Sequence, residues 1–413
     1  MYRKYALLIA AVITAIQATA QGPEVTSWIR NTTGATGYAG IPSNIQLVQY
    51  STADVYVSAT CIPGYDIGPW VMNPNIPANM NFVYKITRNP VPNTGTPTAV
   101  GLGHVGVFSN GVSIFNTQDA RSYNNLGIWN QNAYYFEGSG FDNCLGHPAP
   151  GGEYHHHVSP KCLYNITDST HHSPIIGYAF DGYPVYGAWA YSNTDGTGPI
   201  RRMKSSFRLR SITQRHTKPD GTMLTAPQWG PDVNATYALG AYQEDFEYIA
   251  GLGDLDVHNG RWCKTPEYPA GTYCYFVTLD AALQPEYPYT IGLTYYGIVQ
   301  PGNIGPGSGH NTPSGTTTIY TPTAVAEISQ NDLAPEIFPN PAGNFINLFI
   351  QPVNSSNFTV TLTDQMGKTL FTQQNVQPTI LYTFDMSAIP AGMYVMHVKN
   401  EAITWSQKVV LVK

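Results

Sequence analysis

The residues of this chain best suited to chemistry are three consecutive histidines, His155, His156 and His157, which follow Glu153-Tyr154. In an extended strand, successive side chains point to opposite faces. His155 and His157 should therefore share one face, and His156 should lie on the other with Tyr154. Two imidazoles on one face of a strand can chelate a metal ion, so the spacing predicts a metal site at 155–157.

Other residues of the same region can complete such a site. The further candidate ligands are His147, His172, His258 and His104. Asp181 is the candidate carboxylate, because Asp181-Gly182 fits a tight turn. Imidazole-rich ligation without thiolates favours copper or zinc. A calcium site is not expected, because no Asp-x-Asp-x-Asp loop is present.

The five cysteines bear on how such a site is held. The expected disulfides are Cys144–Cys162 and Cys263–Cys274, because each pair closes a short local loop. The first loop would enclose the histidine run and keep its strand rigid. Cys61 is left over, either as a buried thiol or as the partner of a cysteine in a different pairing. The connectivity cannot be read from the sequence alone.

The N-terminus reads as a targeting segment. Arg3 and Lys4 precede a short apolar stretch, and Ala18-Thr19-Ala20 is a small-x-small cleavage pattern, which predicts a signal peptide at 1–20. No later run of about 20 apolar residues exists, so no transmembrane segment is expected in the mature chain. Export to an oxidising compartment would allow the disulfides to form.

The composition favours a mainly β protein. Charged residues make up only 11% of the chain, whereas Gly (39), Pro (32) and Tyr (29) are frequent, which is typical of strands joined by ordered turns. The net charge of −6 lacks the basic footprint of a nucleic-acid binder. No nucleic-acid partner is therefore expected.

The chain divides by composition into a large β-rich region at 21–299, a Gly/Pro/Thr-rich linker at 300–334 and a small β domain at 335–413. Alternating apolar residues predict strands in the last part at 345–350, 358–363, 369–372, 382–385, 392–398 and 405–412. Such regular spacing predicts an Ig-like β-sandwich.

This last part resembles the type A sorting domain of the type IX secretion system of Bacteroidetes. The resemblance rests on Ile337-Phe338-Pro339-Asn340-Pro341-Ala342, Asp364-Gln365-Met366-Gly367-Lys368, Ile389-Pro390-Ala391-Gly392-Met393-Tyr394 and the terminal run from Gln407 to Lys413. It implies recognition by the outer-membrane translocon, followed by release or attachment at the cell surface. The residues expected to carry the sorting signal are Pro339, Asn340, Pro341, Gly392, Tyr394 and Lys413.

The region at about 100–299 resembles the YHYH proteins. The matching segments are Cys144-Leu145-Gly146-His147-Pro148, Glu153-Tyr154-His155-x-His157, Cys162-Leu163, His172 to Gly187, Leu255 to Arg261, Thr265 to Tyr273 and Tyr287 to Gly292. His156 departs from the family's naming motif, which has Tyr there. The resemblance implies a domain and its matching positions, but no activity.

Three functions follow as expectations. The first is a secreted or cell-surface protein with a metal-binding, histidine-rich YHYH domain. The second is a metal-free module that binds an extracellular ligand or glycan, or that is structural. The third is an extracellular hydrolase that uses a histidine as general base with a carboxylate. Neither a Gly-x-Ser-x-Gly nor a His-Glu-x-x-His motif supports the third.

Overall fold

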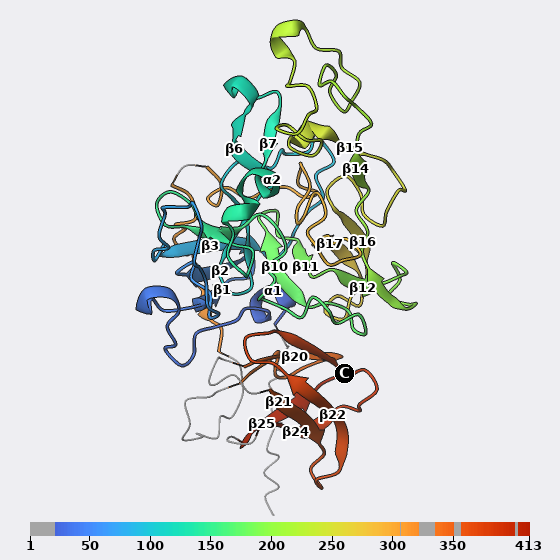
Figure 1. Cartoon of the computed structure of the whole chain (residues 1–413). Coiled ribbons are helices and arrows are strands. Elements are labelled where there is room, and N and C mark those ends of the chain that lie inside the picture. The colour runs from blue at the N-terminus through green and yellow to red at the C-terminus, as the bar shows by residue number, and fades with distance from the viewer. Residues whose placement is uncertain (1–20, 306, 322–334, 351–356, 401–403) are drawn as a thin grey trace, which may run out of the picture.

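The computed structural model describes residues 21–305, 307–321, 335–350, 357–400 and 404–413. The expected signal peptide at 1–20 and the second part of the expected linker, 322–334, lie outside the described residues. Figure 1 shows a large β-rich body, with the C-terminal strands forming a smaller body beside it. Among the described residues, none of the helices has both the length and the apolar character needed to span a bilayer.

A mixed eight-stranded sheet forms the centre of the large body. Its strands, in spatial order, are β16 (Gly260–Cys263), β17 (Thr272–Phe276), β11 (Pro184–Tyr186), β10 (Ile175–Ala179), β4 (His104–Phe108), β5 (Ser113–Phe115), β9 (Tyr154–His156) and β8 (His147–Pro148). Most neighbours are antiparallel, but β5 pairs with β9 and β11 pairs with β17 in parallel. The histidine run therefore lies on a central-sheet strand next to the sheet edge.

Two tight turns set the register of this sheet. Asn110-Gly111 joins β4 to β5, and Gly111 adopts a φ of 84°. Asp181-Gly182 joins β10 to β11, and Gly182 adopts a φ of 90°. Both glycines occupy the left-handed region that other residues rarely enter, which explains the turn chemistry seen in the sequence.

A four-stranded sheet covers one face of the central sheet. Its spatial order is β18 (Thr318–Ile319), β1 (Ile45–Tyr50), β2 (Asp54–Ala59) and β3 (Phe82–Thr87). Strand β18 comes from the expected linker, and Asn303 and Asn311 also bind the backbone of β3. The first part of that segment is thus packed against the sheet.

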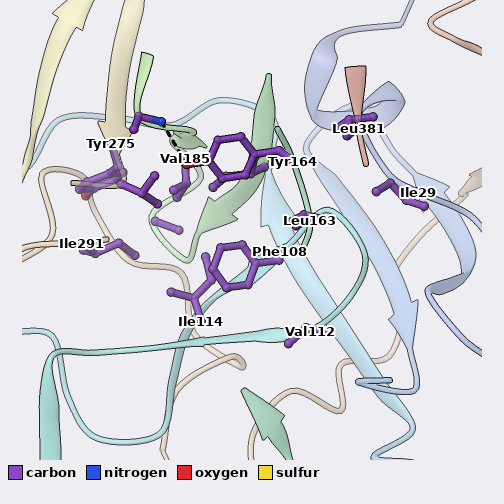
Figure 2. Packing of buried hydrophobic residues seen from close by; sticks show 14 of the residues in the cluster. Ile29, Phe108, Val112, Ile114, Leu163, Tyr164, Val185, Tyr275, Ile291 and Leu381 are labelled. Atoms are coloured by element: carbon purple, nitrogen blue, oxygen red, sulfur yellow. Dashed lines mark hydrogen bonds between the residues drawn. The ribbon is translucent and has the colours of Figure 1, made fainter. Parts of the chain in front are cut away.

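Buried residues form one cluster on each face of the central sheet. The cluster between the two sheets includes Val57, Val107 and Phe276. The cluster on the opposite face includes Ile114, Val185 and Tyr275, which Figure 2 shows packed with Phe108 and Tyr164. Burial on both faces explains why these strands are almost continuously apolar or aromatic.

Short elements surround the sheets. The strands are β6 (Gln118–Ser122), β7 (Asn130–Asn132), β12 (Trp189–Tyr191), β13 (Ile200–Arg202), β14 (Phe207–Leu209) and β15 (Phe246–Tyr248). The helical turns are α1 (Pro23–Thr26), α2 (Ala133–Glu137), η1 (Tyr38–Gly40), η2 (Tyr123–Asn125), η3 (Gly138–Gly140), η4 (Ala226–Gln228) and η5 (Gln243–Asp245). They pair as β6–β7, β12–β13 and β14–β15.

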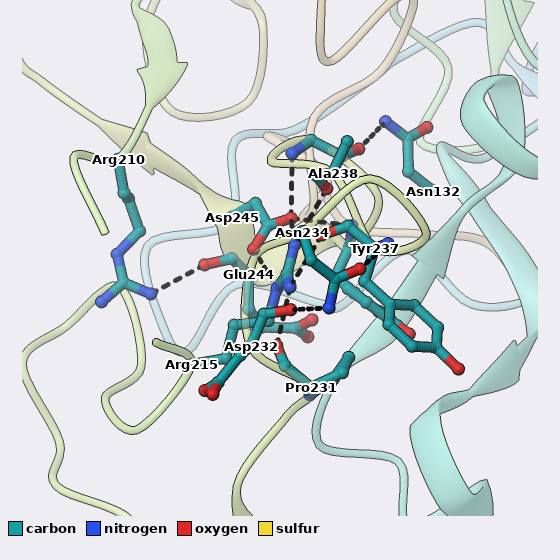
Figure 3. A network of polar contacts seen from close by, with 12 residues as sticks. Asn132, Arg210, Arg215, Pro231, Asp232, Asn234, Tyr237, Ala238, Glu244 and Asp245 are labelled. Carbon is teal, nitrogen blue, oxygen red and sulfur yellow. Dashed lines mark hydrogen bonds and ion pairs between the residues drawn. The ribbon is translucent and has the colours of Figure 1, made fainter. Parts of the chain in front are cut away.

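A buried ion pair organises the long loops between β14 and β15. The Arg215 guanidinium donates to both carboxylate oxygens of Asp245 at 2.7 Å, and neither side chain is exposed. Arg215 also donates to the carbonyl oxygens of Pro231, Tyr237 and Ala238, as Figure 3 shows. Because every partner is satisfied, we attribute this pair to the structure of the loops and not to a site.

The C-terminal domain is a sandwich of two antiparallel sheets. The first sheet has β19 (Glu336–Phe338), β20 (Phe345–Phe349) and β23 (Tyr382–Asp385), and the second has β22 (Thr369–Val376), β21 (Phe358–Thr363), β24 (Gly392–Lys399) and β25 (Thr404–Leu411). Residues of both sheets, such as Leu348 and Val398, form one core. The observed architecture confirms the predicted mainly β fold with a C-terminal sandwich.

The sandwich contacts the large body directly. The Leu381 amide donates to the Leu163 carbonyl oxygen at 3.2 Å, and Leu381 belongs to the same apolar cluster as Ile29 and Leu163 (Figure 2). Glu336 accepts from the Arg30 amide at 3.3 Å. Leu163, which directly follows the disulfide-bonded Cys162, therefore contacts the C-terminal domain.

Candidate metal centre

Strand pairing brings three histidines to one face of the sheet. His147 on β8 lies directly opposite His155 on β9, so both side chains project from the same face. His157 follows His155 by two residues. One ring nitrogen of each histidine lies within 4.8 Å of those of the other two. His155, His157 and His147 thus converge.

A disulfide supports this arrangement. Cys144 and Cys162 are bonded, which confirms the first predicted pair, and their Cα atoms are 5.1 Å apart. The bridge closes the loop that contains both β8 and β9. It therefore restrains the two strands that carry the histidine cluster.

Glu137, the last residue of α2, contacts the cluster and was missed by the sequence interpretation. Its Oε2 atom lies 3.2 Å from the Nε2 atom of His147 and 3.2 Å from that of His157. The packing of α2 near β6 and β7 creates this contact, and no sequence spacing indicates it. Glu137 therefore places a carboxylate beside two of the three imidazoles.

The hydrogen bonds of His155 and His157 fix where their ring hydrogens lie. His155 Nδ1 is 3.1 Å from the Glu153 carbonyl oxygen, and His157 Nδ1 is 2.6 Å from the Asn116 carbonyl oxygen. A carbonyl oxygen only accepts, so both Nδ1 atoms must donate. In the neutral rings, both Nε2 atoms then carry lone pairs, yet they are only 3.1 Å apart. Such a pair requires a proton or a metal cation between the rings.

The Nδ1 atom of His147 contacts a side chain instead of a backbone carbonyl. The Asn73 amide nitrogen lies 3.2 Å from His147 Nδ1 and 2.9 Å from the Pro148 carbonyl oxygen, while Asn73 Oδ1 accepts from the Asn75 amide. This network orients the amide so that it donates to Nδ1, which places the hydrogen of His147 on Nε2. His147 Nε2 and Glu137 Oε2 are both buried and lie 3.2 Å apart, but neither has a hydrogen-bond partner among the described residues in this arrangement. For Nε2 to bind a metal, the Asn73 amide would have to turn.

Burial and mutual contacts shape the ionisation of the cluster. His155 and His157 are almost completely buried. Burial lowers the pKa of His155 well below its usual value, and the neighbouring His147 and His157 lower it further. Burial alone would raise the pKa of Glu137, but its interactions with the nearby His147 and His157 outweigh burial and hold that pKa far below the usual range. The lowered pKa values thus favour neutral rings at His155 and His147 and an ionised carboxylate at Glu137.

The cluster faces a cavity of about 620 Å³. Asp119 and Arg121 on β6 and Gln131 on β7 supply polar side chains to its wall, and Phe115 stacks on the His155 ring at a centroid distance of 3.7 Å. Burial raises the pKa of Asp119 to about 6, helped by the charge and hydrogen bonding of Glu137. A small molecule in this cavity can therefore reach the four converging groups.

The other predicted ligands lie elsewhere. His172 donates from Nδ1 to the Ser173 carbonyl oxygen and lines a separate cavity of about 310 Å³. His258 contacts the Thr294 carbonyl and hydroxyl oxygens at 3.0 and 2.8 Å. His104 binds Glu153 and Ser308. None of them joins the group of histidines found among the described residues.

Asp181 also stays apart from the cluster. Its Oδ2 atom accepts from the Tyr275 hydroxyl at 2.6 Å and from the Gly297 amide at 2.8 Å, and the side chain is fully buried. Burial raises the pKa of this carboxyl to about 6. Its partners show that Asp181 ties the β10–β11 turn to the segment at 295–297.

The second predicted disulfide is absent from the structure. Cys263 and Cys274 are free, buried thiols. In the β16–β17 hairpin, Cys263 lies opposite Thr272 and Cys274 lies opposite Arg261, so the two cysteines are diagonal neighbours. Diagonal Cα atoms are about 7–8 Å apart, beyond the usual reach of a disulfide. Cys61 is also a buried free thiol, and it contacts the Tyr154 carbonyl oxygen at 3.0 Å.

The expected sorting-signal residues belong to the C-terminal sandwich. The Asn340 side chain, between Pro339 and Pro341, donates to the Lys408 carbonyl oxygen and accepts from the Val410 amide. Gly392 begins β24 and pairs with Leu411, and the Tyr394 hydroxyl donates to the Pro390 carbonyl oxygen. Lys413 Nζ donates to the carbonyl oxygens of Met386 and Ser387. These contacts hold the terminal strand within the domain.

Comparison with known proteins agrees with this architecture. Residues 83–288 match the family model described as YHYH protein, and residues 336–413 match that described as secretion system C-terminal sorting domain. No curated protein matches the chain. Among solved structures, a DUF3244 family protein with an immunoglobulin-like β-sandwich fold from Bacteroides vulgatus matches at 15% identity and a TM-score of 0.15, covering 19% of this chain and 91% of that one.

The two family matches place the histidine cluster and the C-terminal sandwich in different modules. Residues 137–157 lie within the first match, and the terminal strand β25 lies within the second. A type IX sorting domain implies handling by that secretion system and a secreted or outer-membrane surface location. The chain thus combines a region that matches the YHYH family with a C-terminal type IX secretion sorting domain.

Proposed function

We propose that this secreted or surface-attached protein binds a transition-metal ion, copper or zinc, through His155, His157 and His147, with Glu137 as the carboxylate ligand. The observation that carries the proposal is the pair of Nε2 lone pairs on His155 and His157, which face each other at 3.1 Å. A cation between them removes the repulsion.

The distances suit a metal of this class. With Zn–N bonds of about 2.0–2.1 Å, neighbouring ligand atoms of a tetrahedral site are about 3.3 Å apart. The separations here are 3.1 Å between the two Nε2 atoms and 3.2 Å from Glu137 Oε2 to His147 and His157. Two ligands already donate Nδ1–H to backbone carbonyls, which is the usual outer support of a metal-binding histidine.

The cavity gives the proposed ion access to a further ligand. Structural zinc sites are usually closed, whereas catalytic and exchangeable sites keep an open position. Because a cavity of about 620 Å³ meets the cluster, we assign it to the open class. In such a site, the ion would supply Lewis acidity to a bound oxygen atom, and Asp119 and Arg121 would contact the same ligand.

Metal analysis of the secreted chain tests the proposal. The full-length mature protein should contain one copper or zinc ion per chain, or should take up one during calorimetric titration after chelator treatment. Metal binding should raise the midpoint of thermal unfolding, because the ion binds the folded state. Glu137→Gln should weaken binding, whereas His171→Ala, which alters an exposed histidine, should not. A folded wild-type chain that binds neither metal would contradict the proposal.

A further inference from the structure

A second group of reactive side chains lies apart from the histidine cluster. It joins His104 of β4, Glu153 just before β9, and Ser308 from the segment that precedes β18. His104 was a candidate metal ligand in the sequence, but its two ring nitrogens are both engaged here. The group therefore needs an explanation of its own.

The three residues are connected in a defined order. Ser308 Oγ lies 2.8 Å from His104 Nε2, and His104 Nδ1 lies 2.9 Å from Glu153 Oε1. This is the arrangement of a serine nucleophile, a histidine base and a carboxylate that orients the base. His104 is 8% exposed, and the rings of Phe82, Tyr84 and Phe180 surround it.

The neighbouring hydroxyl groups indicate where the hydrogens lie. Ser113 Oγ donates to Glu153 Oε1 at 2.5 Å, and the Tyr84 hydroxyl contacts Ser113 at 2.8 Å. Because Ser113 donates its only hydrogen to the carboxylate, Tyr84 must donate to Ser113. The Glu153 carboxylate oxygen then accepts the hydrogen of His104 Nδ1. His104 Nε2 is left with its lone pair toward the Ser308 hydroxyl.

Ser308 is less buried than the histidine that it contacts, because the serine is half-buried and the imidazole is buried. Its neighbours Gly305 and Gly307 have positive φ angles, and a Cβ atom added to either would meet no atom within 4 Å. Open space therefore adjoins these two glycines, which lie just before Ser308 in the chain. Ser308 Oγ also lies 3.0 Å from the Asn303 carbonyl oxygen, so its hydrogen has a second acceptor in addition to the nearer Nε2.

We propose that Ser308, His104 and Glu153 hydrolyse carboxylic esters. Ser308 Oγ attacks the carbonyl carbon and forms a C–O bond, while its proton passes to His104 Nε2. The ester C–O bond then breaks, and the leaving alkoxide takes that proton. A water molecule attacks the acyl-serine, gives a proton to His104, and releases the carboxylic acid as the Ser308 hydroxyl is restored. No oxidant, reductant or metal ion enters this balance.

The test uses the full mature chain, a fluorophosphonate probe and a p-nitrophenyl ester. The probe should label Ser308, as located by peptide mass spectrometry, and the ester should be hydrolysed. Ser308→Ala should abolish labelling and lower ester hydrolysis by at least about 100-fold. Ser314→Ala is the matched control, because Ser314 lies in the same segment and binds the Tyr56 hydroxyl; it should retain both activities.

Two further measurements distinguish a loss of catalysis from a loss of stability, and they test the triad independently of the metal proposal. Glu153→Gln should lower kcat with little change in KM, because the carboxylate acts only by orienting His104, and Glu153→Asp should restore part of the rate. Chelator treatment should leave probe labelling unchanged. Failure of the folded wild-type chain to react with the probe, or labelling that survives Ser308→Ala, would overturn the triad and leave the metal proposal untouched.

Discussion

The two faces of strand β9 use the same amino acid in opposite ways. On one face, His156 has a partner on each nitrogen: the Leu145 carbonyl oxygen at 2.8 Å and the Tyr65 hydroxyl at 3.1 Å. On the other face, His155 and His157 each have a backbone carbonyl at Nδ1, but their Nε2 atoms face each other.

The difference shows that the second nitrogen decides the role of a buried histidine. His156 is fully buried with both nitrogens satisfied, so it stabilises the fold. His155 and His157 are buried to a similar degree, yet a cation is needed to satisfy their facing lone pairs. Burial alone does not distinguish His156 from His155 and His157, whereas their hydrogen-bond donors and acceptors do.

The largest effect should come from replacing one histidine on each face. We expect His155→Ala to lower metal affinity by roughly a thousandfold, about 4 kcal/mol, because it removes a ligand. His156→Phe should change affinity less than about fivefold. Competition titration with a chromogenic chelator measures both. Equal losses in the two variants would remove the distinction between the faces.

The disulfide should contribute the next largest effect. The double variant Cys144→Ser/Cys162→Ser should lower the free energy of unfolding by about 3 kcal/mol, because the bridge restrains the unfolded chain and the β8–β9 loop. Metal affinity should fall with it, since the loop carries both strands. Chemical denaturation under non-reducing conditions measures the change.

Cys263→Ala is the matched control for the disulfide, because that cysteine is buried but unbonded. It should cost only about 1 kcal/mol through lost packing. A comparable loss in the control and in the double variant would show that burial, and not the bridge, stabilises the loop.

Acid should destabilise the folded protein through His156, on the face of β9 opposite His155 and His157. Burial lowers the pKa of His156 to about 4 from an ordinary value of 6.5. Between these values the unfolded chain takes up a proton at this position and the folded chain does not. The free energy of unfolding should therefore fall as the pH drops from 6.5 to 4, by on the order of 3 kcal/mol for this residue.

Denaturation curves across this pH range test the assignment. His156→Phe should flatten the loss of stability, whatever its effect at neutral pH. His171→Phe should not flatten it, because the hydrogen bond that His171 donates to the Asp168 carboxylate raises the pKa of that histidine instead. An unchanged pH dependence in His156→Phe would place the acid sensitivity elsewhere.

The smallest effect concerns the outer partner of His147. Asn73→Asp should tighten metal binding by about tenfold, because a carboxylate accepts the Nδ1 hydrogen and leaves Nε2 free for the ion. Asn75→Asp is the control, since the Asn75 side chain donates to the Pro148 carbonyl oxygen and not to His147. Weaker binding in Asn73→Asp would indicate that His147 is not a ligand.

Local patterns predicted much of the fold. The alternating runs of the C-terminal domain correspond closely to β20–β25. The tight turn expected at Asp181-Gly182 joins β10 to β11. Alternation also predicted that His155 and His157 share a face, which is where the structure places them.

Features that depend on tertiary packing could not be predicted from local sequence patterns. The contact of Glu137 with the histidines arises from the position of α2, and the opposition of His147 to His155 depends on the β8–β9 register. The wrong pairing of Cys263 with Cys274 had the same cause, because sequence separation does not reveal a diagonal position in a hairpin.

The shortness of strand β8 affects how readily the exported protein could aggregate. It forms one edge of the central sheet, and an exposed edge can recruit strands from other molecules. Here the edge strand is only two residues long and ends in Pro148, which has no amide hydrogen to offer a neighbour. His147 can therefore lie on an edge strand of the sheet that is a poor template for aggregation.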